Sequence, residues 1–231
     1  MLILNYHRVG YPSPGTGHRG LYVTPDILAW QIRLLKARGA EFVRVTEGVR
    51  RGCGRGLVAI TFDDGYSDNI ELGFSVIKSA GIKATVYVVS GDVGKKAVVW
   101  PESYSKIPLD LMGWDELRSL EAEGWEIGSH AAEHVHLGTR SPEEQRSLIA
   151  RSWDDFESNL GHKPASFAYP YGSYDDCTVK VLSELGCAAA VTTDPGGINT
   201  RETPPLRLFR HPAKGCCLRH KIISLNLLWK L

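Results

Sequence analysis

Short apolar runs alternate with helical segments along most of the chain. Runs such as Val58-Ala59-Ile60 are apolar without alternation, which is typical of parallel strands that are covered on both faces. Strands are predicted at Leu2–Tyr6, Leu57–Phe62, Ala84–Val89, Trp125–Ser129, Ser166–Tyr169, Ala188–Thr193 and Leu206–Phe209. Helices are predicted from Thr24 onward and at Asp68–Ala80, Trp114–Glu123, Ser141–Leu160 and Asp175–Leu185. This alternation indicates parallel strands joined by crossover helices, either in a β/α barrel or in a doubly wound sheet.

Two of the helices have clear start signals. Thr24 can cap the first helix, and Pro25 suits its first position. The segment Ser141-Pro142-Glu143-Glu144 forms a capping box with a proline in the first turn, and Gly161 supplies the stop. The stretch from Gly91 to Asp110 lacks such signals and is predicted to be a long loop, of the kind that often forms the wall of an active site.

The composition excludes some classes of function. The 231 residues suit one domain, and the formal net charge of +1 argues against nucleic acid or an anionic membrane as the main partner. Five cysteines without a Cys-x-x-Cys pair favour free thiols over a disulfide framework, with adjacent Cys216-Cys217 left open as a metal or redox feature.

The two ends of the chain bear on localisation. The segment Met1–His7 does not resemble a signal peptide, and no apolar run is long enough to span a bilayer. A complete sequence would therefore predict a cytoplasmic protein. The apolar tail at residues 222–231 is expected to pack as a terminal helix, with a membrane-surface or partner contact as the alternative.

Polar residues follow five of the predicted strands. These segments are Tyr6-His7, Asp63-Asp64-Gly65, Ser129-His130, Tyr169-Pro170-Tyr171-Gly172 and Arg210-His211. The carboxyl ends of barrel strands meet at one face of the barrel, where active sites form. Singly, each segment also fits an ordinary turn or a solvated charge, but together they predict one polar site.

Two histidines in this set have the spacing of metal ligands. His130 and His134 are four residues apart, which in a helical turn would place them on one face. With one aspartate they would leave an open position for water, the pattern of a catalytic zinc site. His136 remains an alternative to His134. Near them, the backbone N–H of Tyr171 could bind a developing oxyanion.

Three motifs together resemble the polysaccharide deacetylases of carbohydrate esterase family four. They are Thr61-Phe62-Asp63-Asp64-Gly65, His130-x-x-x-His134, and Phe167-Ala168-Tyr169-Pro170-Tyr171-Gly172. The resemblance covers about residues 2–212 of a domain expected to span residues 1–231, with a short tail at residues 213–231. It implies a distorted, incomplete (β/α) barrel in a single domain and a divalent metal, usually zinc and sometimes cobalt or nickel.

The resemblance also implies roles for individual residues. Asp63 corresponds to the general base, Tyr171 to the oxyanion donor, and Asp64, His130 and His134 to the metal ligands. Ala131 departs from the family, which usually has serine or threonine there.

The third motif lacks the usual arginine, as in the poly-N-acetylglucosamine deacetylases. By analogy with that subgroup, His7 is expected to be the general acid, with His220 as the weaker candidate. Arg210 is expected to orient the base, with Arg207 as the runner-up.

The resemblance predicts hydrolysis of N-acetyl groups from the amino sugars of a glycan, with release of acetate. Two alternatives stay open, namely a deformylase or other amidase acting on a lipid-linked sugar, and a non-catalytic carbohydrate-binding barrel. Chitin, peptidoglycan, xylan, poly-N-acetylglucosamine and a glycolipid precursor all remain possible substrates.

Overall fold

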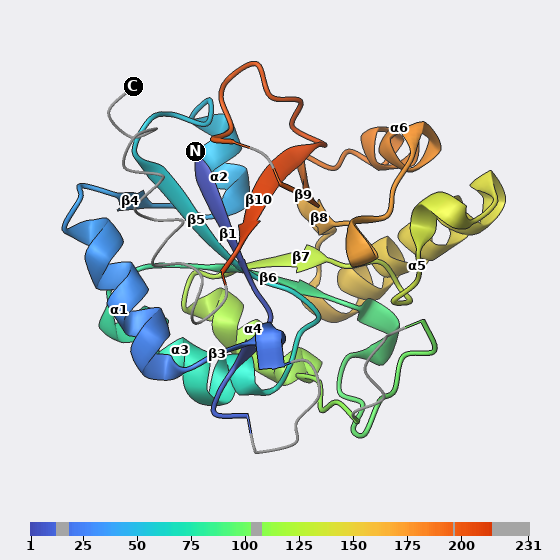
Figure 1. Cartoon of the computed structure of the whole chain (residues 1–231). Coiled ribbons are helices and arrows are strands. Elements are labelled where there is room, and N and C mark those ends of the chain that lie inside the picture. Colours follow the sequence, from blue (N-terminus) through green and yellow to red (C-terminus); the bar gives the residue numbers. More distant parts are fainter. Residues whose placement is uncertain (13–18, 103–107, 196, 214–231) are drawn as a thin grey trace.

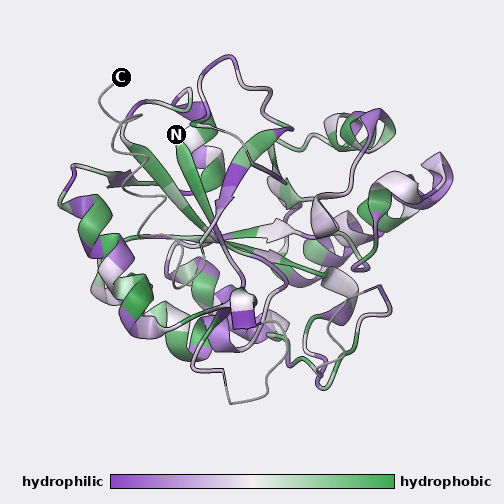
Figure 2. Ribbon diagram, in the orientation of Figure 1, coloured by the Kyte–Doolittle hydropathy of each residue, from purple (hydrophilic) through white to green (hydrophobic). Residues whose placement is uncertain are grey.

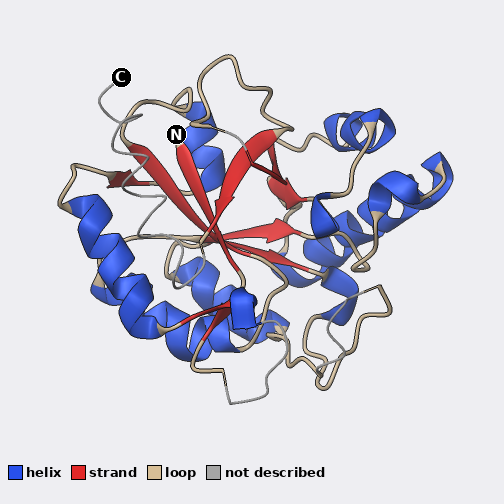
Figure 3. Cartoon of the chain, viewed as in Figure 1, coloured by secondary structure: helices blue, strands red, loops and turns tan. Residues whose placement is uncertain are grey.

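Seven parallel strands close into a barrel that is wrapped by helices (Figures 1 and 3). The computed structural model describes residues 1–12, 19–102, 108–195 and 197–213. The strands of the barrel are β1 (Leu2–Tyr6), β5 (Leu57–Phe62), β6 (Thr85–Val88), β7 (Glu126–Ser129), β8 (Ser166–Ala168), β9 (Ala189–Pro195) and β10 (Leu208–Pro212). The ring closes because β1 pairs with β5 on one side and with β10 on the other.

Two shorter pairings lie beside this ring. β4 (Glu41–Phe42) extends the sheet next to the first residues of β5, and β2 (Arg8–Val9) pairs with β3 (Tyr22–Val23) in a separate two-stranded sheet. A barrel of seven strands is one short of the eight of a regular (β/α) barrel. The expectation of an incomplete barrel is confirmed, and the doubly wound sheet is excluded by the closure.

Helices follow most strands and cover the outside of the barrel. The α-helices are α1 (Pro25–Lys36), α2 (Val45–Arg50), α3 (Phe74–Ser79), α4 (Trp114–Ala122), α5 (Pro142–Leu160) and α6 (Asp176–Glu184). Short turns are η1 (Arg19–Leu21), η3 (Ser90–Asp92), η4 (Leu137–Thr139), η5 (Pro170–Gly172) and the π-helical turn η2 (Asn69–Gly73). As predicted, Ser141 caps α5 in a capping box, and Gly161 ends that helix in the left-handed conformation.

Alternation along β5 separates two hydrophobic layers. Val58, Ile60 and Phe62 pack outward against a core that includes the buried faces of α1, α3 and α4. Ala59 instead packs with residues of β8, β9 and β10, inside the barrel. β1 and β5 are correspondingly hydrophobic over most of their length, whereas β10 and the helices show both hydrophobic and hydrophilic residues (Figure 2). By the same alternation Thr61 and Asp63 lie on the inner side of β5.

Several predicted boundaries need correction. The last strand was predicted at Leu206–Phe209, but β10 begins at Leu208 and runs to Pro212. The helix predicted at Asp68 begins with the π-helical turn η2, and α2 and β4 were not predicted. Cys216-Cys217, His220 and the apolar tail at residues 222–231 lie outside the described residues. Within the described residues, every helix is too short or too polar to cross a membrane.

Candidate active site

The polar residues that follow the strands gather at the carboxyl end of the barrel. Asp63 and Asp64 follow β5, His130 follows β7, and Arg210 lies on β10. All four side chains are buried, as is His134 in the loop after β7. The structure therefore brings together residues that are separated by up to 147 positions along the chain.

Three of these residues form a cluster that can hold a metal ion. One potential ligand atom from each of Asp64, His130 and His134 lies within 4.8 Å of the others. The Oδ1 atom of Asp64 is 3.3 Å from the Nε2 atoms of both histidines. That oxygen is buried and accepts no hydrogen bond from any described residue, so the cluster has an unmet acceptor at its centre.

The tautomer of His130 also fits a metal ligand. Its Nδ1 atom lies 2.7 Å from the carbonyl oxygen of Ala168, and a carbonyl can only accept, so Nδ1 carries the proton. A neutral imidazole protonated at Nδ1 presents the lone pair of Nε2 toward Asp64. In many metal sites a backbone carbonyl that accepts from the other ring nitrogen orients a histidine ligand in this way. The donor set of two imidazoles and one carboxylate thus suits a divalent cation.

The two histidines do not meet through a helical turn, which corrects the sequence interpretation. The segment that follows β7 is a loop, and Ala131 has a left-handed backbone with φ of 63°. This loop is attached to η3, because the N–H groups of Ser90 and Gly91 donate to the carbonyls of Ala131 and Ala132. The Ala131 N–H in turn donates to the hydroxyl of Ser129, at 3.1 Å.

His136, the alternative ligand, lies outside the cluster. Its ring stacks on Tyr171, with ring centroids 4.2 Å apart and planes 17° apart. Tyr171 lies in η5 with a left-handed φ of 56°, and its ring also contacts His134 edge-on at 4.3 Å. The Tyr171 hydroxyl is buried without a partner among the described residues. Burial, together with Asp64 and Glu102, raises the pKa of this phenol to about 12.

The adjacent carboxylates Asp63 and Asp64 face different partners. Asp64 has a left-handed φ of 76°, and so has Gly65, which turns the chain sharply after β5. Asp63 instead accepts a bidentate pair from Arg210, with Nη1–Oδ1 and Nη2–Oδ2 distances of 2.6 Å and 2.8 Å. One acid thus faces the two histidines and the other faces a guanidinium.

Arg210 is itself fixed by burial and by further hydrogen bonds. Its side chain is 1% exposed, its Nε atom donates to the Thr192 carbonyl at 2.9 Å, and its Nη1 atom also donates to the Thr61 hydroxyl at 3.2 Å. Arg207, the runner-up, lies at the surface and pairs with Asp176. The structure therefore separates the two arginines that the sequence left as alternatives.

Electrostatics keep both carboxyl groups ionised. Burial raises the pKa of Asp63, but the charge and hydrogen bonds of Arg210, with His130 and His7, outweigh it, so the pKa lies below the ordinary 3.8. Burial also acts on Asp64, and the opposing effect of His134, His130 and His7 brings that pKa well below 3.8. Burial, together with the charges of His130 and His7, lowers the pKa of His134 more than Asp64 raises it, which favours the neutral imidazole.

His7 stands at the end of β1, partly exposed. It is within electrostatic reach of both carboxylates, because it contributes to lowering the pKa of Asp63 and of Asp64. His220, the weaker candidate for the same role, lies outside the described residues.

Trp100 adjoins the site and was not singled out in the sequence. Its ring stacks on His134 with centroids 4.2 Å apart, and its Nε1 atom donates to Asp92 at 2.7 Å. It comes from the long loop that was predicted to line the site. A tryptophan within a predicted long loop is the sequence signal that could have identified this residue.

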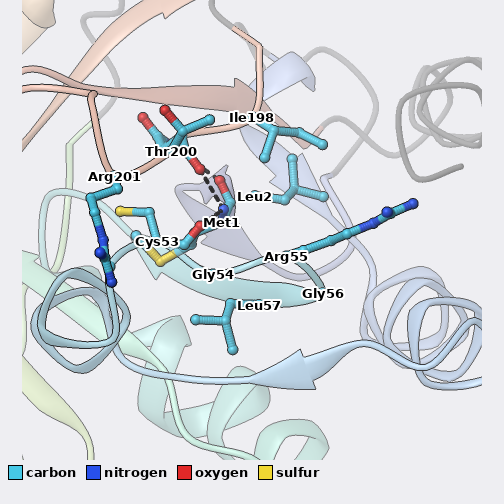
Figure 4. A pocket seen from close by; sticks show the side chains of 12 residues that line it. Met1, Leu2, Cys53, Gly54, Arg55, Gly56, Leu57, Ile198, Thr200 and Arg201 are labelled. Atoms are coloured by element: carbon cyan, nitrogen blue, oxygen red, sulfur yellow. Dashed lines mark hydrogen bonds between the residues drawn. The ribbon is translucent and has the colours of Figure 1, made fainter. Parts of the chain in front are cut away.

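A separate apolar cavity of about 490 Å³ opens at the other end of the barrel (Figure 4). Met1, Cys53, Leu57 and Ile198 line it, near the amino ends of β1 and β5. It shares no residue with the cluster around Asp64.

Comparison with known proteins supports the relationship that the motifs indicate. The family model described as "Polysaccharide deacetylase" matches residues 51–190. The chain is 31% identical over 139 residues to YxkH of Bacillus subtilis (strain 168), which covers 60% of this chain and 45% of that protein. It is 24% identical over 208 residues to the poly-beta-1,6-N-acetyl-D-glucosamine N-deacetylase of Staphylococcus aureus (strain MRSA252). This match covers 80% of this chain and 69% of that protein. The chain thus spans less than half the length of YxkH.

Solved structures share the fold over nearly the whole chain. The Streptococcus pyogenes deacetylase PplD, in complex with acetate, has a TM-score of 0.81 and 24% identity, covering 97% of this chain and 96% of that one. IcaB from Ammonifex degensii has a TM-score of 0.82 and 22% identity, covering 96% and 95%.

Proposed function

Because the chain belongs to the polysaccharide deacetylase family, we propose that it removes N-acetyl groups from the amino sugars of a polysaccharide or glycoconjugate and releases acetate. The observation that carries the proposal is the buried cluster of Asp64, His130 and His134 beside an ionised Asp63. A cluster with an unmet acceptor next to a fixed carboxylate is the arrangement that hydrolysis of an amide needs.

Asp64, His130 and His134 would hold a divalent cation. Two imidazoles and one carboxylate suit zinc, and cobalt and nickel accept the same donors. A cation bound there would polarise the acetamide carbonyl and lower the pKa of a water that it binds.

Asp63 is the proposed general base. Its lowered pKa keeps it ionised, and each oxygen retains a lone pair beside the bond from Arg210, so it can accept the proton of the attacking water. Arg210 does not touch the substrate in this proposal. It holds the plane of the Asp63 carboxylate, which positions the base.

Two further groups complete the proposed reaction. His7, when protonated, would donate its proton to the departing amine nitrogen. The backbone N–H of Tyr171, on the turn η5, would stabilise the developing oxyanion. The stacking of Tyr171 on His136 holds this turn against the loop of the histidines.

For the substrate, we propose a polymer that contains N-acetylglucosamine. The support is the similarity to a poly-beta-1,6-N-acetyl-D-glucosamine N-deacetylase, which extends over 80% of this chain. Residues 103–107, within the stretch that the sequence predicts to be a long loop, lie outside the described residues.

An acetate-release assay on a panel of N-acetylated glycans, with and without a chelator, tests the proposal. We expect acetate release that stops on chelation and returns with zinc. Asp63→Asn should abolish turnover and keep metal bound, whereas Asp64→Ala should lose the metal. Formate release from formylated sugars in place of acetate would favour the deformylase, and glycan binding without metal or turnover would favour a non-catalytic barrel.

A further inference from the structure

The backbone around His7 is held by hydrogen bonds to residues outside the proposed catalytic and metal-binding set. η2 begins immediately after Asp68, four positions beyond Asp64, and its first residue is Asn69. Asn69 is fully buried, and its side-chain Nδ2 donates to the backbone carbonyl of His7 at 2.8 Å. A buried side-chain amide that donates a hydrogen bond to a backbone carbonyl fixes the position of that peptide group.

Asp68 fixes the residues that follow His7. Its Oδ1 atom accepts from the backbone N–H of Val9 at 3.0 Å, and its Oδ2 atom accepts from Nε of Arg8 at 2.8 Å. Asn69 donates to the same carboxylate at 3.1 Å, so the two neighbouring side chains form one network.

Packing reinforces this network on both sides. The Arg8 guanidinium lies between the rings of Tyr22 and Tyr66, at 4.7 Å and 4.9 Å from their centroids. Cation–π contacts of this kind help to hold an arginine whose Nε atom already donates to a carboxylate. On the other side, a side chain at Gly73 would come within 3.1 Å of Val9, so η2 and β2 pack closely.

The residue before His7 is fixed by the proposed base itself. The backbone N–H of Asp63 donates to the carbonyl of Tyr6 at 3.0 Å. The backbone of His7 is therefore held on both sides, while its imidazole stays partly exposed at the carboxyl end of the barrel.

We propose that Asp68 and Asn69 are positioning residues that hold the backbone of His7, so that its imidazole meets the departing amine. They act on proton donation and not on metal binding. This inference rests on the proposed function, in which His7 is the proton donor. A displacement of about 1 Å in a catalytic group can cost about 100-fold in rate, so the network matters even though neither residue touches the substrate.

Two substrates separate positioning of the acid from a merely structural role. The amine of an N-acetylglucosamine oligomer must be protonated as it leaves, whereas the phenolate of 4-nitrophenyl acetate leaves without a proton. For Asn69→Ala, we expect kcat on the oligomer to fall about 10- to 100-fold with KM and zinc content unchanged. Hydrolysis of the aryl ester should stay within about twofold of the wild type.

A conservative variant and a matched control complete the experiment. Asp68→Asn keeps an oxygen for the Val9 N–H and removes the charge facing Arg8, so a smaller loss, of about 3- to 10-fold, is expected on the oligomer alone. If Asn69→Ala does not fold, the comparison of oligomer and ester hydrolysis in Asp68→Asn tests the inference instead. Asn159→Ala removes an exposed amide that also donates to a backbone carbonyl, in α5, and should leave both activities unchanged.

Three outcomes would count against the inference. Wild-type turnover of the oligomer in both variants would overturn it, and so would a parallel loss of amide and ester hydrolysis. A wild-type protein that releases no acetate from any N-acetylated glycan would overturn the proposed function, and the inference with it.

Discussion

Replacing Arg210 by methionine would leave the buried carboxylate of Asp63 without its cation. The side chain of Arg210 is 1% exposed and makes two short bonds to Asp63. Removing one partner of a buried ion pair lowers the free energy of unfolding by about 3–5 kcal/mol. For a chain of this size, about 1 kcal/mol lowers Tm by roughly 2–4 °C, so the expected decrease is about 6–20 °C.

The size of this decrease should depend on pH in a defined direction. In the wild type the pKa of Asp63 is lowered, so its pairing stabilises the fold above the unfolded value near pH 4 and is lost as pH falls through the lower folded value. Without Arg210, burial dominates and raises this pKa. The variant carboxyl then gains a proton at higher pH, so the difference in Tm should be widest near neutral pH and should narrow toward about pH 4.

Thermal unfolding followed by circular dichroism between pH 4 and pH 8 measures both effects, and acetate release over the same range reports on the base. The acidic limb of turnover should move to higher pH in Arg210→Met. Arg207→Met is the matched control, because Arg207 lies at the surface with an ion pair to Asp176 and a ring contact with Tyr174, and should change Tm little. Equal losses in both variants, or a pH-independent difference for Arg210→Met, would refute the reasoning.

Three other predictions follow from the site and its support. His134→Gln should lose most of the bound zinc measured by atomic absorption, whereas His136→Gln should keep it; similar retention in both would contradict the ligand assignment. Dialysis against a chelator should lower Tm, and readdition of zinc should restore it, because an ion that binds only the native state stabilises it. Gly128→Ala should destabilise the fold by about 1–3 kcal/mol in urea unfolding, since the added carbon would lie 2.5 Å from the ring of Tyr87. Gly197→Ala, with open space around it, is the control, and an equal effect would argue against the clash.

Local signals account for the parts of the fold that could be predicted. β1 and β5 have the bounds expected from their apolar runs, and α5 begins at its capping box and ends at Gly161. α2 was missed because it has only six residues and no side-chain cap at Arg44. The choice between a barrel and an open sheet could not be made locally, because it depends on the pairing of β1 with both β5 and β10.

The residues of the site were easier to predict than their arrangement. The motifs singled out His130 and His134, but the left-handed Ala131 and the contacts with η3 place them together in a loop. The resemblance favoured Arg210 over Arg207, but the contact of Arg210 with Asp63, 147 positions away, is not encoded by spacing along the sequence. The contact of Asn69 with His7 carries no sequence signature, because an asparagine in a helical segment is ordinary.

The closure of the ring through its first and last strands also fixes when the site can exist during synthesis. β10, which carries Arg210, emerges from the ribosome after all other described strands. Until then β1 and β9 present unpaired edges, and Asp63 has no guanidinium beside it. A nascent chain that stops short of β10 should therefore be inactive and prone to edge-to-edge association. The final strand brings Arg210 to Asp63 and closes the sheet in one event.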